Sequence, residues 1–284
     1  MKVWFITGAS RGFGALVAER ALANGDAVVA TARDSQKIVE RFGDRSNLLP
    51  ITLDVTDAAQ ARAAAEEAVR QFGRIDVLLN NAGYGLLGAV EEASAEEIEA
   101  LYRTNVFGLL AVTRAVLPHM RRERAGHIIN ISSVGGISSF SGWGVYGSTK
   151  FAVEGLSEAL SMELAPLGIH VTVVEPGFFR TDFLDTSSLV TSANKIADYH
   201  ETSGAMRQTA IEANHNQPGN PDKLAEIILN IGSLAKPPFR LPLGSDTVTR
   251  SERRITDAQA MLKQWRDVAV STDFEPMGAA AWAG

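Results

Sequence analysis

Three polar residues near the middle of the chain have types and spacing suited to acid–base chemistry on a carbonyl oxygen. Tyr146 and Lys150 are four residues apart, so on a helix their side chains share one face and reach one ligand. Ser133 lies thirteen residues before Tyr146, at the end of an apolar run. If that run is a strand of an open parallel sheet, its carboxyl end faces the ligand crevice and the three side chains converge there.

These residue types suit proton transfer to an alkoxide. Hydride transfer to a ketone leaves an alkoxide, and a phenol with a pKa of about 10 can donate the proton it needs. A lysine ammonium about 4 Å from the phenolate would attract it by about 4 kcal/mol at an effective dielectric constant of about 20, before desolvation is subtracted. We therefore expect Lys150 to lower the pKa of Tyr146, and Ser133 to donate a hydrogen bond to the substrate oxygen.

A second group of residues has the pattern of a phosphate-binding turn. The sequence Thr7-Gly8-Ala9-Ser10-Arg11-Gly12-Phe13-Gly14 follows an apolar run and opens a stretch with helical spacing. Glycines there allow tight turns, and free backbone N–H groups at a helix start bind a pyrophosphate. Glycines alone also fit a plain strand-to-helix turn, so the flanking strand and helix are what favour a dinucleotide site.

The elements that must position these groups alternate along the chain. Short apolar runs rich in β-branched residues predict strands at 3–7, 27–32, 48–55, 77–82, 127–132 and 171–174. Stretches with helical spacing lie between them, at 15–24, at 56–72 and after the capping box Ser94-x-x-Glu97. This alternation predicts an α/β fold, a doubly wound parallel sheet (Rossmann-like) between two helical layers.

The domain organisation follows from the same pattern. We expect one catalytic domain over 1–284, because no linker interrupts the alternation. Residues 182–219 are polar and mixed, and we expect a substrate lid there, made of helix and loop. Residues 232–244 are rich in proline, and 245–284 form a C-terminal extension that is helical over 245–267.

Composition excludes several classes of function. The net charge of −6 argues against nucleic-acid binding. The chain has no cysteine, which excludes disulfides and thiolate metal sites and suits the reducing cytoplasm, where we expect the protein. The five histidines lack metal-ligand spacing, so we expect no metal. We find no signal peptide and no run of 18 apolar residues, and so expect no membrane association.

Together these motifs resemble the single-domain branch of the short-chain dehydrogenase/reductase family. The resemblance covers residues 1–181 and rests on the Thr-Gly-x-x-x-Gly-x-Gly turn, Asn80-Asn81-Ala82-Gly83, Ser133 and Tyr146-x-x-x-Lys150. Ser132 competes with Ser133, but the thirteen-residue spacing selects Ser133. The resemblance implies hydride transfer between an alcohol and its ketone or aldehyde, with Tyr146 as acid and base. It adds Asn105, which would hold a water that passes protons from Lys150 to solvent.

The resemblance also implies a nicotinamide cofactor and places its parts. The adenine would meet the end of the third strand, the nicotinamide carboxamide would lie after the sixth, and Lys150 would hydrogen-bond the nicotinamide ribose. With the two arginines discussed next, the expected cofactor-binding residues are Gly8, Ser10, Arg11, Gly12, Phe13, Gly14, Arg33, Asp54, Val55, Asn81, Ala82, Gly83, Tyr146, Lys150, Pro176, Gly177 and Thr181.

The choice between NADP(H) and NAD(H) depends on the end of the second strand. By family register the discriminating position is Ala32, which carries no carboxylate, and Arg33 follows it. Two guanidinium groups, of Arg11 and Arg33, would converge on a 2′-phosphate and favour NADP(H). A slip of one or two residues would instead place Asp34 on the ribose hydroxyls and favour NAD(H).

The substrate pocket is inferred from family register. The residues placed near the reacting carbon or leading into the lid are apolar or aromatic: Gly135, Trp143, Gly177, Phe178, Phe179 and Phe183. We expect a hydrophobic ketone or alcohol, as in steroid- and retinol-dehydrogenase-like members. Two alternative functions remain: a β-ketoacyl-carrier-protein reductase, favoured by the basic run Arg121-Arg122-x-Arg124, and a non-catalytic nucleotide sensor on the same fold.

The resemblance also bears on assembly. Helices at 100–120 and 146–165 would pair across a twofold axis, giving a homodimer or a homotetramer.

Overall fold

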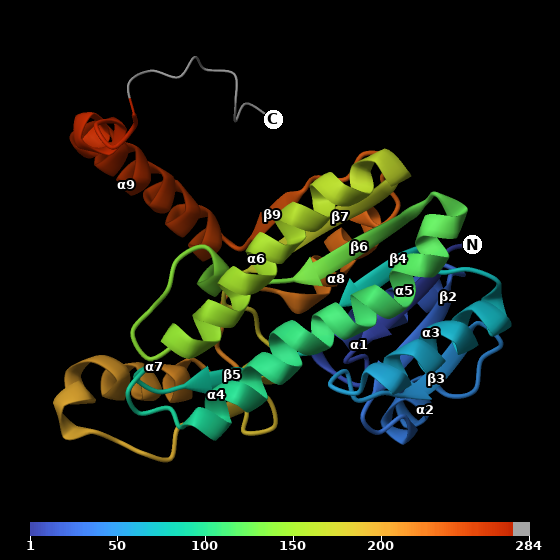
Figure 1. Cartoon of the computed structure of the whole chain (residues 1–284). Coiled ribbons are helices and arrows are strands. Elements are labelled where there is room, and N and C mark those ends of the chain that lie inside the picture. Colours follow the sequence, from blue (N-terminus) through green and yellow to red (C-terminus); the bar gives the residue numbers. More distant parts are fainter. Residues whose placement is uncertain (275–284) are drawn as a thin grey trace.

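A seven-stranded parallel sheet forms the centre of the computed structural model, which describes residues 1–274 (Figure 1). In spatial order its strands are β3 (Leu48–Thr52), β2 (Ala27–Ala32), β1 (Val3–Thr7), β4 (Val77–Asn80), β6 (Gly126–Ile131), β7 (Ile169–Pro176) and β9 (Arg240–Leu243). The strand order reverses between β1 and β4. At such a switch point the crevice at the carboxyl ends of the strands is the usual ligand site.

Helices cover both faces of this sheet, and the side-chain alternation of β1 shows how. Trp4 and Ile6 join a buried cluster with one helical layer, whereas Val3 and Phe5 join a second cluster on the opposite face. The first layer is formed by α1 (Gly12–Ala23), α2 (Gln36–Phe42) and α8 (Pro221–Ile231). The second is formed by α3 (Ala58–Phe72), α5 (Leu109–Glu123) and α6 (Gly144–Leu164). The predicted doubly wound α/β fold is confirmed.

Several element boundaries differ from the sequence pattern. The apolar run at 48–55 continues three residues past β3, because β2 ends at Ala32, whose carbonyl accepts the N–H of Leu53. The strand β9 was not predicted, because its segment is rich in proline and Pro242 lies within it. An edge strand tolerates proline, since one of its sides needs no ladder hydrogen bonds.

The helix expected at 100–120 is part of a longer helical stretch. It begins with α4 (Ala95–Tyr102), which the predicted capping box of Ser94 and Glu97 opens. A π-helical turn at Arg103–Gly108 joins α4 to α5. Such turns are often found at functional sites. Here the turn carries Asn105, one of the expected catalytic residues.

The region at 182–219 contains short elements over the carboxyl edge of the sheet. A three-residue strand β8 (Leu189–Thr191) pairs with β5 (Gly85–Leu87), and α7 (Ala205–Ala213) follows. The last helix, α9 (Ser245–Val270), extends away from the body beyond its base (Figure 1). Within residues 1–274, no helix combines the length and apolar character that crossing a membrane requires.

Candidate active site

The glycine-rich turn (residues 7–14) and the Ser133, Tyr146 and Lys150 side chains line one cavity of about 1110 Å³. The cavity lies at the carboxyl ends of the strands, beside the switch point. It collects every expected cofactor-binding residue except Gly14, and every expected substrate-binding residue. Of the expected catalytic residues only Asn105 lies outside its lining.

Gly14 shapes the glycine-rich turn from behind the cavity wall. A Cβ atom built there would lie 2.4 Å from the Gly8 carbonyl oxygen and 2.5 Å from Nδ2 of Asn81. The helix α1 can therefore approach the turn closely only with glycine at this position. Gly8 itself has φ +66°, a left-handed conformation that favours glycine.

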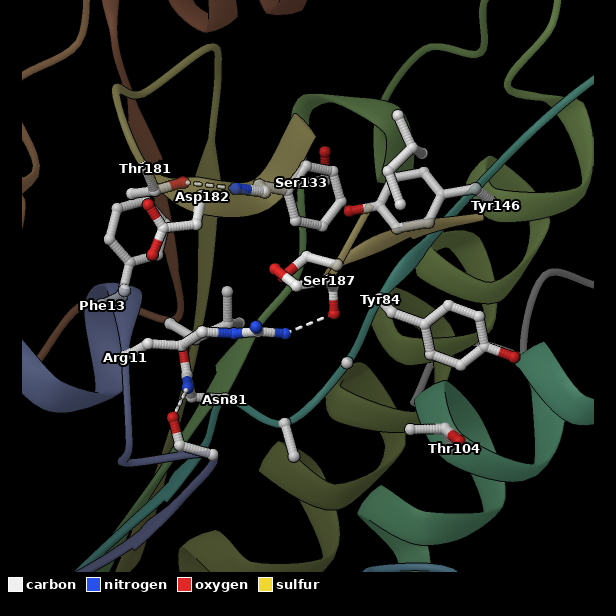
Figure 2. Close-up of a pocket in the computed structure, with 18 of the residues that line it drawn as sticks. Arg11, Phe13, Asn81, Tyr84, Thr104, Ser133, Tyr146, Thr181, Asp182 and Ser187 are labelled. Carbon is white, nitrogen blue, oxygen red and sulfur yellow. Dashed lines mark hydrogen bonds between the residues drawn. The ribbon is translucent and has the colours of Figure 1, made fainter. Parts of the chain in front are cut away.

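The turn is pinned to the end of β4. The Asn81 side-chain amide donates to the carbonyls of Thr7 and Gly8, each at 3.0 Å. In return, Oγ1 of Thr7 accepts from the N–H groups of Asn81 and Ala82. The Asn81 bond to the turn is drawn in Figure 2. These bonds make a rigid floor whose remaining N–H groups, at the start of α1, suit an anion.

Ser133 and Tyr146 meet at the other side of the cavity (Figure 2). Ser133 follows the end of β6, and its Oγ accepts from the Gly135 N–H at 3.0 Å and lies close enough to the Tyr146 phenol to affect its pKa. Lys150 lies one helical turn after Tyr146 and is buried, with its Nζ donating to the Ile131 carbonyl at 2.9 Å. The expected convergence of the three side chains is therefore present.

Burial sets the protonation of both groups. Burial raises the pKa of Tyr146 to about 12, although the neighbouring Ser133 side chain acts in the opposite direction. Burial lowers the pKa of Lys150 to about 8, and the Glu154 carboxylate opposes this. The expected lowering of the tyrosine pKa is thus wrong for the protein's own groups. Desolvation is the largest cause of the raised pKa, and the Lys150 Nζ lies 5.7 Å from the Tyr146 ring centre.

Asn105 lies behind Lys150 rather than in the cavity wall. Its side-chain oxygen accepts from the Tyr84 N–H at 3.1 Å, and its amide donates to the Tyr84 carbonyl at 3.0 Å and to Thr149. A Cβ atom at Gly83 would lie 3.1 Å from the Asn105 oxygen and 3.9 Å from the lysine Nζ. Asn105 and Lys150 therefore both border the Cα atom of Gly83.

The two arginines expected to converge on one phosphate are arranged differently. Arg11 reaches across the cavity and donates to the Ser187 carbonyl in the segment 182–219 (Figure 2). Arg33 lines the cavity together with Asp34 and Lys37. The carboxylate of Asp34 accepts from the Gln36 N–H at 3.1 Å, just before α2.

Sequence reasoning missed some of the residues that line this end. Lys37 lies in the first turn of α2, four residues after Arg33, and its positive charge so close to that arginine was the available sequence signal. Ser187 had no sequence signal, because it contributes a backbone carbonyl to a long-range contact.

The opposite end of the cavity is aromatic. Its rings, called here the aromatic end, belong to Phe140, Trp143, Phe178 and Phe183. Trp143 stacks on Phe183 with ring centres 6.4 Å apart, and Tyr146 lies 5.6 Å from Phe183. Phe179, expected in the substrate group, instead packs edge-on against Phe13 beside the glycine-rich turn, at 5.6 Å.

Comparison with known proteins decides the family. A family model described as short chain dehydrogenase matches residues 2–189 of the chain. The chain belongs to the short-chain dehydrogenase family. Among curated relatives, Oxidoreductase BOA17 of Botryotinia fuckeliana is 38% identical over 274 residues, which cover 95% of this chain and 99% of that protein. A 3-ketodihydrosphingosine reductase of Bacteroides thetaiotaomicron is 40% identical over 244 residues, 86% of this chain and 88% of that one.

Solved structures agree with the family and bear on the cofactor. A short-chain dehydrogenase from Streptomyces avermitilis has a TM-score of 0.87 and 40% identity, covering 96% of this chain and 100% of that chain. ElxO with NADP bound has a TM-score of 0.73 and 29% identity (87% and 99% covered). A short-chain dehydrogenase/reductase from Burkholderia phymatum in complex with NAD has a TM-score of 0.79 and 26% identity (92% and 95% covered). This short-chain dehydrogenase is an NAD(P)-dependent oxidoreductase that acts on CH–OH groups.

Two buried carboxylates lie beyond the lysine of this short-chain dehydrogenase. Glu154, one turn after Lys150, and Glu175 on β7 both approach Arg240, whose Nη1 lies 3.0 Å and 3.1 Å from them. Burial and the neighbouring Glu154 raise the pKa of Glu175 to about 7, against the attraction of Arg240. Burial also raises the pKa of Glu154. Glu158 approaches the same guanidinium at 3.8 Å but is exposed.

This pair predicts how stability depends on pH. Because the folded-state pKa of Glu175 exceeds its ordinary value of 4.5, its contribution is full below pH 4.5 and is lost as pH rises through 7. The loss amounts to about 3 kcal/mol. We expect Glu175→Gln, which stays neutral, to flatten the decline in urea-unfolding free energy between pH 5 and 8. Glu158→Gln is the control and should keep the wild-type slope. Equal slopes in Glu175→Gln and wild type would contradict the assignment.

Proposed function

We propose that this short-chain dehydrogenase reduces an uncharged, hydrophobic ketone or aldehyde with NADPH, and oxidises the corresponding alcohol in the reverse direction. The observation that carries this proposal is the place of Tyr146. Its phenol lies beside Ser133 where the glycine-lined part of the cavity joins the aromatic end. A proton donor at that junction reaches a carbonyl held between a dinucleotide and an apolar wall.

The residues beside the switch point fit a nicotinamide dinucleotide. The rigid turn offers free N–H groups to a pyrophosphate, and Gly14 keeps the start of α1 close to it. When bound, the nicotinamide supplies or accepts the hydride at the junction with the aromatic end. The adenine, the nicotinamide ribose and the carboxamide would be held by Asp54 and Val55, by Tyr146 and Lys150, and by Pro176, Gly177 and Thr181, respectively.

The protein's own groups then hold and move one proton. Tyr146, with its pKa raised to about 12, is protonated at neutral pH and donates to the substrate oxygen in reduction. Ser133 donates to the same oxygen and orients it. The Lys150 ammonium stabilises the phenolate that remains and then supplies the proton that restores the phenol. Asn105, fixed by the Tyr84 backbone, would hold the water that returns a proton to the lysine.

Preference for NADPH is assigned to Arg33 and Lys37. Both are cavity-lining cations near the end of β2, while the Asp34 carboxylate is engaged by a backbone N–H. We expect Arg33→Ala to raise the KM for NADPH about 10- to 100-fold and to leave the KM for NADH nearly unchanged, because one charge-assisted hydrogen bond is lost. Arg41→Ala is the control, since Arg41 lies on α2 outside the cavity and faces Glu19. A wild-type enzyme faster with NADH would show instead that Asp34 binds the ribose.

The segment 182–219 is assigned the role of a substrate lid. It contributes Phe183 to the aromatic end and is joined to the glycine-rich turn by the Arg11–Ser187 contact. A second anchor is the buried Glu92 carboxylate, which accepts from the Ile196 N–H at 2.9 Å and pairs with Arg207. Since Arg11 holds the lid backbone, nucleotide binding and lid closure would share this side chain.

The aromatic end is what favours a hydrophobic substrate, and the Bacteroides relative named as a 3-ketodihydrosphingosine reductase supports a ketone. The test is NADPH consumption across a matched panel of ketones: alkyl, aryl and polycyclic ketones against short polar keto acids. We expect kcat/KM to rise with apolar surface. Turnover confined to the polar keto acids would refute the hydrophobic assignment.

The two alternative functions are less well supported. The basic run that would dock an acidic carrier lies at the end of α5, just before β6 begins. It is therefore at the amino ends of the strands, whereas the cavity is at their carboxyl ends. Arg124 of this run is bonded to the Pro166 carbonyl at 2.7 Å. A nucleotide sensor has no use for a phenol paired with Ser133 in the cavity, and the tyrosine variant discussed below separates it from an enzyme.

The surface that supports a homodimer lies on α6 and on the π-helical turn that precedes α5. Phe107, Phe151 and Met162 expose large apolar side chains there, with Met162 67% exposed. We assign this surface to the dimer contact expected for the two long helices.

A further inference from the structure

The helix α9 carries an uncovered apolar stripe. Val248, Ile255 and Leu262 are seven residues apart and are 42%, 57% and 62% exposed. Trp265, three residues after Leu262, is 55% exposed. Ala258 lies at the equivalent position one heptad earlier, three residues after Ile255. The apolar residues therefore take one core position of a heptad repeat at 248, 255 and 262 and the other at 258 and 265, whereas Ser251 takes the second core position of the first heptad.

This helix has little support from its own chain. Thr247, in the first turn, is its only buried residue. Near the base, Asp246 accepts from the Phe178 N–H at 2.8 Å and Arg250 stacks over the Phe140 ring at 3.8 Å. Beyond that base the helix extends from the body (Figure 1). A helix in water draws most of its stability from packing its apolar face, so the stripe on α9 needs a partner. A repeat of seven residues is the pattern with which one helix packs against another in a coiled coil.

We propose that α9 pairs antiparallel with α9 of a second copy of this chain. In that register Ile255 lies opposite Trp265 of the second copy, and Leu262 lies opposite Ala258 of the second copy. Ile255 thus packs against an aromatic ring and Leu262 packs against a methyl group. This fills the contact between the two helices, called here the seam, without steric overlap. The twofold axis passes near residue 260 and repeats each contact, as an isologous interface requires.

The charges beside the stripe favour this orientation. In the antiparallel pair Glu252 lies next to Arg266 of the second copy, and the symmetry gives this contact twice. A parallel pair would place Arg266 against Met261 of the other copy. The register is therefore complementary in charge as well as in volume. It involves a surface distinct from that on α6 and the π-helical turn, so the two contacts together build a tetramer from dimers.

The first test measures the mass of the protein by sedimentation equilibrium. We expect Leu262→Glu to halve the wild-type mass, because a carboxylate would lie in the seam, and Gln264→Glu, on the other side of the helix, to leave it unchanged. Circular dichroism checks that both variants keep their fold. An unchanged mass in Leu262→Glu would overturn the proposal. This is also the result expected if other residues of the same chain, rather than a second copy, cover the stripe.

A charge exchange tests the orientation. Glu252→Arg and Arg266→Glu should each weaken association about tenfold, because two attractive contacts become repulsive. The double variant should recover the wild-type association constant. Failure of the double variant to recover would refute the antiparallel register.

Cross-linking supplies an independent test, because the chain contains no cysteine. Gln259→Cys places the only thiol beside the proposed axis, and Gln264→Cys is the matched control facing away from the seam. A short bis-maleimide should join two copies of the first variant at least tenfold faster than two copies of the second. Equal rates would contradict the pairing. Neither this measurement nor the mass depends on the proposed enzymatic function.

Discussion

Replacing Tyr146 with phenylalanine is expected to lower the turnover of a ketone with NADPH by about 10²- to 10⁴-fold, the usual contribution of a positioned general acid. The ring remains packed against Trp143 and Phe183, so the cavity keeps its shape. Only the phenol that meets Ser133 is removed. NADPH affinity, measured by fluorescence titration, should stay within a few-fold of wild type.

The matched control for this variant is Tyr102→Phe. The Tyr102 hydroxyl donates to Ser148 at 2.8 Å and does not line the cavity, so its removal should leave turnover near wild type. Undiminished turnover in Tyr146→Phe would refute the proton-donor role. Lost NADPH binding in the same variant would show that the lower turnover comes from the missing nucleotide rather than from the missing proton donor.

The second large effect is expected for Lys150→Met, which should lower turnover on the order of 10²-fold without lowering stability. The ammonium is buried and its pKa is lowered to about 8 by desolvation, so its charge costs folding free energy. Methionine fills a similar volume and loses one hydrogen bond, from Nζ to the Ile131 carbonyl. Removing the cation, however, leaves the Tyr146 phenolate without its stabilising charge.

The measurement combines kcat with the urea-unfolding free energy of the same preparation. A variant that loses activity and also several kcal/mol of stability would indicate a structural role for Lys150 instead. The double variant with Tyr146→Phe should be hardly slower than Tyr146→Phe alone, because residues that act as one unit are not additive.

Much of the fold was predictable because the signals are local. Apolar runs of five or six residues identified β1 and β2 at their observed bounds, and a capping box identified the start of α4. What escaped prediction depends on neighbours far along the chain. The strand β9 exists because β7 offers it an edge, and the three-residue β5 pairs with β8 about a hundred residues later.

The candidate site divides in the same way. Residue types, order and the four-residue spacing were enough to bring Ser133, Tyr146 and Lys150 together. The direction in which the pKa of Tyr146 shifts could not be predicted, because it depends on desolvation within a folded aromatic cavity. Nor could the sequence show that Arg11 bonds a carbonyl 176 residues away rather than turning toward Arg33.

The most direct test of hydride transfer follows deuterium from the cofactor to the product. The enzyme is incubated with a hydrophobic ketone and NADPH carrying deuterium on the reactive face of C4, and the alcohol is analysed by mass spectrometry. We expect one deuterium on the carbinol carbon of the alcohol, formed by wild type and formed far more slowly by Tyr146→Phe. An alcohol without the label, or no alcohol despite tight NADPH binding, would contradict the proposed function.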